Sequence, residues 1–79
     1  MNNKMLVVVY SPLVDKEFDV FIPINKKVGT IKNIIINSIN NYDSMTEHIL
    51  INKEDSKIID ENIYVKNSGI KNGARLILL

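Results

Sequence analysis

The feature that most constrains this chain is one apolar stripe with helical spacing in residues 30–42. On a wheel of 3.6 residues per turn the stripe contains Ile31, Ile34, Ile35, Ile39 and Tyr42. Isoleucine and the asparagines between these positions are weak helix formers, so a helix here depends on burial of its isoleucines. Each buried side chain contributes roughly 1.5–3 kcal/mol. We therefore expect one helix, with Thr30 as its N-cap, lying on a flat apolar surface.

Strand-like segments on both sides of the helix can supply that surface. They are residues 5–10, 18–22, 48–51, 57–60 and 74–79. In residues 18–22 the alternation predicts that Phe18, Val20 and Ile22 share one face. Residues 61–69 are expected to be irregular, and Asn72-Gly73 predicts a turn with a positive φ angle.

Length and composition exclude several classes of protein. The 79 residues predict a single domain, residues 1–79. The chain has no cysteine, which excludes disulfides, thiolate metal sites and iron–sulfur clusters. A net charge of +1 gives no reason to expect nucleic acid or an acidic membrane surface as a partner. No segment has the length of a signal peptide's apolar region or of a membrane span. We therefore expect a cytoplasmic protein without direct membrane insertion.

Catalytic residues are hard to find in this sequence. His48 is the only histidine and follows Glu47. Adjacent strand positions point to opposite faces, so the two side chains should diverge, and His48 is expected at the surface. The nucleophile, phosphate-binding and zinc-protease motifs are also missing. We expect no enzyme activity, no cofactor and no metal site.

The order strand, strand, helix, strand, short strand, strand resembles the β-grasp arrangement of ubiquitin. Two motifs narrow the resemblance to the YukD/EsaB family, the small ubiquitin-like proteins of bacterial type VII secretion systems. They are Phe-Asp-Val-Phe-Ile-Pro at residues 18–23 and Ser-Gly-Ile-Lys-Asn-Gly-Ala-Arg-Leu at residues 68–76. The resemblance implies an α+β fold, with a mixed four- to five-stranded sheet and one helix packed on one face. It also implies a cytoplasmic accessory protein that binds secretion-system subunits.

The end of the sequence separates this adaptor role from conjugation. Ubiquitin and the β-grasp sulfur carriers act through a flexible tail ending in Gly-Gly, whereas this sequence closes on Leu-Ile-Leu-Leu. We therefore expect a non-conjugating adaptor. The alternatives are a ubiquitin-like scaffold unrelated to secretion, and a sulfur carrier or modifier whose tail lies beyond this chain.

A partner is expected to bind the sheet face that the helix leaves open. Residues 5–9 and 76–79 are apolar at every position, so one apolar set must point away from the helix whatever the register. The family pattern assigns Leu6, Val8, Tyr10, Leu76 and Leu78 to the inside. The expected protein-binding residues are then Met5, Val7, Val9, Phe21, Leu50, Ile77 and Leu79. The partner is a protein, either another subunit or a second copy of this chain.

Overall fold

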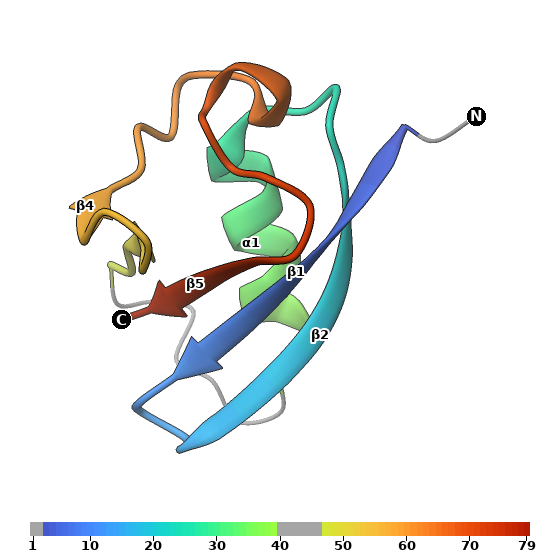
Figure 1. Ribbon diagram of the computed structural model, residues 1–79. Helices are drawn as coiled ribbons and strands as arrows, with labels where there is room; N and C mark the ends of the chain where they lie inside the picture. Colours follow the sequence, from blue (N-terminus) through green and yellow to red (C-terminus); the bar gives the residue numbers. More distant parts are fainter. Residues whose placement is uncertain (1–2, 40–46) are drawn as a thin grey trace.

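The computed structural model describes residues 3–39 and 47–79 and shows the expected order of elements (Figure 1). Along the chain these are β1 (Lys4–Ser11), β2 (Lys16–Pro23), α1 (Val28–Ser38), β3 (Leu50–Asn52), β4 (Lys57–Ile58), the 3₁₀ helix η1 (Val65–Asn67) and β5 (Ala74–Leu78). Tyr42, which the helical spacing predicts on the apolar stripe, lies outside the described residues.

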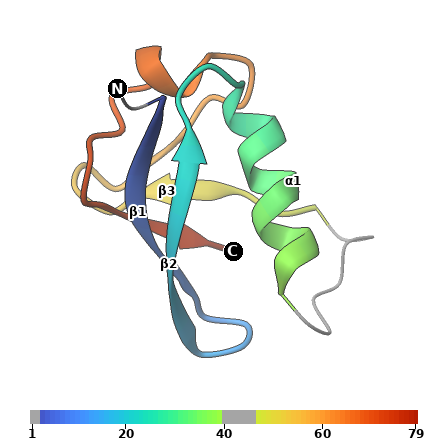
Figure 2. The same cartoon turned by 90° about the vertical axis from the view of Figure 1, so that its right-hand side faces the viewer.

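The strands form one mixed sheet in the order β2-β1-β5-β3-β4. The first and last strands, β1 and β5, are parallel neighbours at its centre, and the other pairs are antiparallel. Helix α1 covers one face of the sheet, and within residues 3–39 and 47–79 no second helical layer covers the other face (Figures 1 and 2). The predicted α+β architecture is confirmed. No helix within the described residues is long and apolar enough to cross a membrane.

The strand β1 faces the opposite way from the prediction. Val7 and Val9 are fully buried under α1, whereas Leu6 and Val8 are partly exposed and Tyr10 is exposed. The register with β2 sets this phase: Val7 pairs with Val20 on the helix side. The apolar run of β1 carries no alternation of its own, so the sequence of this strand alone leaves its phase open. The inward placement of Leu76 and Leu78 is confirmed.

Helix α1 begins before Thr30, and loop carbonyls rather than a side chain satisfy its first N–H groups. Val28 N–H donates to the Ile63 carbonyl (2.9 Å) and Gly29 N–H to the Glu61 carbonyl (3.0 Å). The expectation that Thr30 is the N-cap is wrong. The N-cap is Lys27, the residue before the helix, and its side chain makes no cap hydrogen bond. A Cβ on Gly29 would lie 3.3 Å from the Glu61 carbonyl oxygen, so glycine permits this close approach.

The buried face of α1 is rotated from the predicted stripe. Ile31, Ile35 and Ile39 are buried as expected, but Ile34 is 51% exposed and Ile36 is buried. Ile34 and Ile36 lie on opposite flanks of the stripe, about 200° apart on the wheel. The flank of Ile36 also carries Lys32, which contacts the chain before β3 and after β4, so this flank is covered and that of Ile34 is not.

The predicted turn at Asn72-Gly73 is confirmed and fastens β5 to β1. Gly73 has φ +86°, and its N–H donates to the Leu6 carbonyl. The Leu6 N–H donates to Oδ1 of Asn72 at 2.8 Å. The turn therefore binds both main-chain groups of one β1 residue, on the side of β1 that faces away from β2.

Candidate protein-binding surface

The sheet face opposite α1, called the open face below, carries a connected set of apolar side chains. Cross-strand partners share a face, and the register pairs Leu6 with Phe21, Tyr10 with Ile77, and Ile51 with both Ile77 and Ile58. Val8 lies between Leu6 and Tyr10 on the same side of β1. The open-face apolar residues are Leu6, Val8, Tyr10, Phe21, Ile51, Ile58 and Ile77. They reach from β2 to β4, across the whole width of the sheet.

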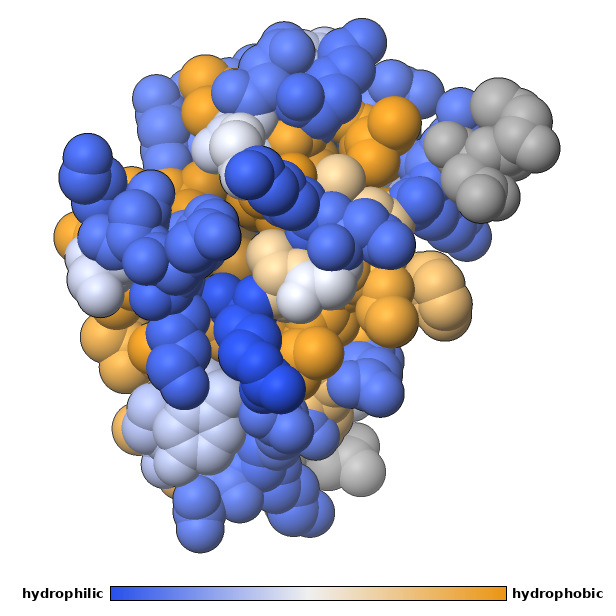
Figure 3. All heavy atoms as spheres, in the orientation of Figure 1, coloured by the Kyte–Doolittle hydropathy of each residue, from blue (hydrophilic) through white to orange (hydrophobic). Residues whose placement is uncertain are grey.

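Exposure varies along this set. Phe21 is 68% exposed and Ile58 is 65% exposed, at the two edges of the sheet. Leu6, Val8, Ile51 and Ile77, nearer the middle, are only partly exposed. Figure 3 shows this face, on which hydrophobic patches alternate with hydrophilic side chains. The four partly exposed residues Leu6, Val8, Ile51 and Ile77 are called the apolar floor below, and hydrophilic side chains surround them.

The structure keeps some of the predicted binding residues on this face and removes others. Phe21 and Ile77 lie on it, and Leu79, 43% exposed, continues its alternation. The expected outward orientation of the remaining four is wrong: Val7, Val9 and Leu50 are buried in the core, and Met5 packs against it. Residues 49–51 are apolar throughout, like residues 5–9, so periodicity does not fix the phase there. Pairing of Leu50 with the buried Leu78 turns it inward.

The open-face residues that sequence reasoning missed are Leu6, Val8, Tyr10, Ile51 and Ile58. A signal for β1 was present in the sequence. The predicted alternation of residues 18–22 puts Val20 and Ile22 inside, and a hairpin that pairs Ser11 with Lys16 then puts Val7 and Met5 opposite them. The two-residue strand β4 leaves too little pattern to predict Ile58.

Basic side chains border the apolar floor near the Asn72-Gly73 turn. Lys53, Lys71 and Arg75 line a surface hollow of about 350 Å³, which Glu54 also borders. A second hollow of about 250 Å³ adjoins it, lined by Val8, Tyr10, Glu17, Lys53, Arg75, Leu76 and Ile77. The side chains of Arg75 and Glu17 form a 3.1 Å ion pair and are both more than half exposed. At the β5 side the surface thus presents three cations, together with the carboxylates of Glu17 and Glu54, beside these apolar residues.

Tyr10 is held by a polar contact at the hairpin end of this face. Its hydroxyl donates to Oδ1 of Asp15 at 2.9 Å. This hydrogen bond and the negative charge of Asp15 raise the pKa of Tyr10 above its usual value of 10.0. The phenol is therefore fixed as a donor at neutral pH, with its ring beside Ile77.

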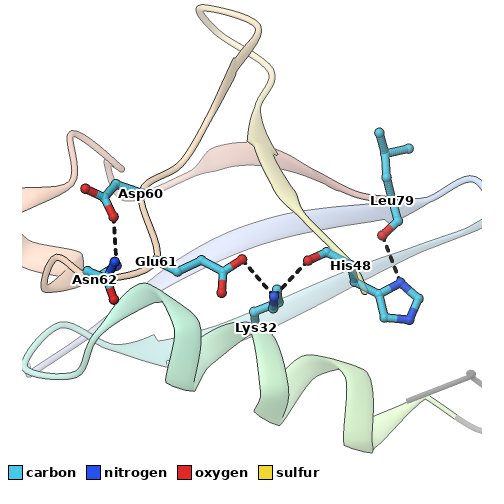
Figure 4. Close-up of polar contacts among 6 residues, drawn as sticks. All are labelled: Lys32, His48, Asp60, Glu61, Asn62 and Leu79. Atoms are coloured by element: carbon cyan, nitrogen blue, oxygen red, sulfur yellow. Dashed lines mark hydrogen bonds and ion pairs between the residues drawn. The ribbon is translucent and has the colours of Figure 1, made fainter. Parts of the chain in front are cut away.

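His48 was expected at the surface, but it is buried, with 4% of its area exposed. Its Nδ1 lies 2.9 Å from the Leu79 carbonyl oxygen, and its own carbonyl accepts a 2.7 Å bond from Nζ of Lys32 (Figure 4). The same Nζ lies 2.7 Å from Oε2 of Glu61. These contacts join α1 to the segments on either side of β3 and β4, which is a structural role. Within residues 3–39 and 47–79 no three His, Asp or Glu side chains are grouped as a metal site would require.

Solved structures show which fold this is, although no protein-family model and no curated protein matches the sequence. A ubiquitin-like domain of an Arabidopsis thaliana protein has a TM-score of 0.77 at 19% identity, over 99% of this chain and 78% of that one. A chain from a structure on molecular mimicry of SUMO in DNA repair has a TM-score of 0.85 at 10% identity, over 100% and 94% of the two chains. A chain of the MycP5-free ESX-5 inner membrane complex has a TM-score of 0.80 at 13% identity, over 99% of this chain and 21% of that one. These likenesses show a ubiquitin-like β-grasp fold.

Proposed function

We propose that this protein is a non-catalytic adaptor whose open face binds another protein. The observation that carries the proposal is the row of apolar side chains from Phe21 to Ile58, with its middle partly exposed and cations at one border. Apolar area in the centre of an interface supplies affinity, and the charged border sets orientation. Because Lys53 and Lys71 border this row and neither belongs to an ion pair within residues 3–39 and 47–79, the matching surface combines an apolar centre with carboxylates on one side.

We further propose that this partner is a subunit of a type VII secretion system and that the adaptor acts in the cytoplasm. Two observations support the assignment. The motifs at residues 18–23 and 68–76 resemble those of the YukD/EsaB family. A chain of the MycP5-free ESX-5 inner membrane complex, a type VII secretion complex, has a similar fold over part of its length, and this likeness supports the proposal.

The test compares binding by wild type and by the double variant Ile51→Asp/Ile77→Asp. Both side chains are partly exposed on adjacent strands, so the changes put two charges in the middle of the open face. Val7 is unsuitable because it is buried, and a charge there would unfold the domain. Leu13→Asp is the matched control, since Leu13 is 68% exposed in the β1–β2 turn and away from the open face.

The expected result is that wild type and Leu13→Asp, immobilised on beads, retain secretion-system subunits from membrane and cytoplasmic extracts of the source cells. The double variant should retain none while keeping a native circular dichroism spectrum. Equal retention by the folded double variant contradicts a role for the open face. Retention of proteins unrelated to secretion contradicts the secretion assignment but not the adaptor role.

A further inference from the structure

The edge strand β2 has main-chain groups that no other strand of the sheet uses. In an antiparallel pair alternate residues bond to the partner strand and the others point away. Ile24 N–H donates to the Asn3 carbonyl, so the even-numbered residues of β2 point toward β1. Consistently, both main-chain groups of Leu6, the β1 partner of Phe21, are directed to the 72–73 turn. The N–H and C=O groups of Glu17, Asp19 and Phe21 therefore point outward.

This edge is long and uncovered by the described part of the chain. β2 has eight residues, whereas β4 at the opposite edge has two. In Figure 2 the outer edge of β2 faces the viewer, and none of the labelled elements lies in front of it. Unpaired edges of this length are templates for an added strand.

Apolar side chains border the edge on the helix side of the sheet. Phe18 and Val20 point toward α1 but remain partly exposed, because β2 has a neighbour on one side only. Ile34 is 51% exposed on the flank of α1 opposite Lys32 and Ile36. Lys32 contacts His48 before β3 and Glu61 after β4, so its flank of the helix lies toward β3 and β4. The opposite flank, which carries Ile34, therefore lies toward β2. An added strand would bury alternate side chains against these three residues.

On the open-face side the β2 edge carries negative charge, and this charge determines which kind of strand can pair with it. Glu17 and Asp19 lie on the open face together with Phe21, and all three are exposed. Glu17 pairs with Arg75, while no ion pair in residues 3–39 and 47–79 involves Asp19. A second copy paired antiparallel about Phe18 or Asp19 would place Asp19 opposite Glu17 or Asp19 of its partner, and like charges directly opposite are destabilising. Pairing about Val20 would place Asp19 opposite Phe21, with no cation to meet the carboxylate. A strand with basic side chains at those positions would instead be attracted.

We propose that β2 accepts an extended segment of a partner protein as a sixth strand of the sheet. Its main chain pairs with Glu17, Asp19 and Phe21. Its residues alternate between apolar side chains toward Phe18, Val20 and Ile34, and lysine or arginine toward Asp19 and Glu17. This edge shares Phe21 with the open-face apolar residues, but its main-chain pairing does not involve Ile51 or Ile77, the two residues that test the function proposed above, so the two proposals can fail separately.

The probe is the acetylated and amidated peptide Thr-Leu-Val-Lys-Val-Lys-Thr, which has this alternation in the antiparallel direction. Titrated into ¹⁵N-labelled protein, it should saturate and shift the amide signals of Glu17, Asp19 and Phe21, and slow their hydrogen exchange. In the matched control peptide the main-chain nitrogens of both lysines are methylated. It keeps every side chain but removes two of the three main-chain donors that would bond to β2, those opposite Asp19 and Glu17, and it should not bind. Binding of the N-methylated peptide with equal affinity overturns the proposal.

Protein variants test the charge selection. Asp19→Lys should weaken peptide binding by about five- to tenfold, because one attraction becomes a repulsion across the strand pair. Glu47→Lys, an equal charge change at an exposed residue before β3, should leave the affinity unchanged. Circular dichroism of both variants establishes that they are folded. The proposal is wrong if Asp19→Lys binds like wild type, or if the shifts fall at Ile51 and Ile77 instead. It is also wrong if the peptide shows no saturable binding, or if sedimentation shows that the protein dimerises through β2.

Discussion

Nζ of Lys32 lies 2.7 Å from Oε2 of Glu61, and this ion pair links the middle of α1 to the loop that follows β4. The Lys32 side chain is 13% exposed and that of Glu61 is 38% exposed, so the pair is shielded from water mainly on the lysine side. The ammonium also holds the His48 carbonyl at 2.7 Å. One side chain thus connects three segments that are distant in sequence (Figure 4).

We expect Lys32→Met to destabilise the domain by about 1–3 kcal/mol. Methionine keeps the apolar stem of lysine but leaves the His48 carbonyl and the Glu61 carboxylate without their donor. Urea denaturation followed by circular dichroism measures the change in the free energy of unfolding. Lys26→Met, at an exposed position, is the control and should change it by less than about 0.5 kcal/mol. Equal stability of the two variants would show that the ion pair contributes nothing.

A pair of neighbouring valines tests the phase of β1. Val7 is fully buried and Val8 is partly exposed on the other face. Val7→Ala should cost about 2 kcal/mol, because two buried methyl groups are lost and a small cavity remains. Val8→Ala should cost less than about 1 kcal/mol. Chemical denaturation of both variants measures the difference, and the reverse order would mean that β1 faces the other way.

Alkaline pH should reveal the contact between Tyr10 and Asp15. The carboxylate raises the pKa of Tyr10 in the folded protein, so the folded state holds the phenolic proton more tightly than the unfolded state does. The stabilisation from this contact is complete below the unfolded pKa of 10.0 and is lost as the pH rises through the higher folded pKa. Asp15→Asn should lower the pKa of Tyr10, as read from tyrosinate absorbance in a Tyr42→Phe/Tyr64→Phe background. An unchanged titration curve would rule out the contact.

The turn before β5 should depend on glycine for its backbone conformation. Gly73 has φ +86°, and nothing lies within 4 Å of a Cβ built on it. Gly73→Ala should therefore cost about 1 kcal/mol through backbone strain rather than collision. Gly73→Asn should cost less, since asparagine tolerates a positive φ better. Thermal unfolding of both variants tests this order, and an alanine variant as stable as wild type would contradict it.

The sequence predicted the elements well because each has a distinct local pattern. The alternation around Phe18 and Val20, the helical spacing of Ile31 and Ile35, and the Asn72-Gly73 pair each carry their own signal, and the structure bears out all three. Their order was enough to indicate the ubiquitin-like fold.

Orientation was harder to predict because it depends on neighbours. Val7 and Val8 are identical in sequence terms, and only pairing with β2 distinguishes the buried one. Ile34 and Ile36 are similarly placed on the two flanks of the helix, and the covering of one flank by distant loops decides which is buried. The existence of an apolar set on the open face followed from residues 5–9 and 76–79 being apolar at every position. Which residues belong to that set could be decided only from the register of the strand pairs.

The parallel pairing of β1 with β5 also constrains how this domain can form. The bond between Leu6 N–H and Asn72 joins residues 66 apart in the chain, and the two strands are the innermost of the sheet. Closing so large a loop is a slow step in folding. During synthesis β1 has no β5 neighbour until residues 74–78 have emerged from the ribosome, so until then Val7 and Val9 lack their partners Ala74 and Leu76. The hairpin and helix formed before then are a platform for the last strand, and the nascent chain is most exposed to aggregation in that interval.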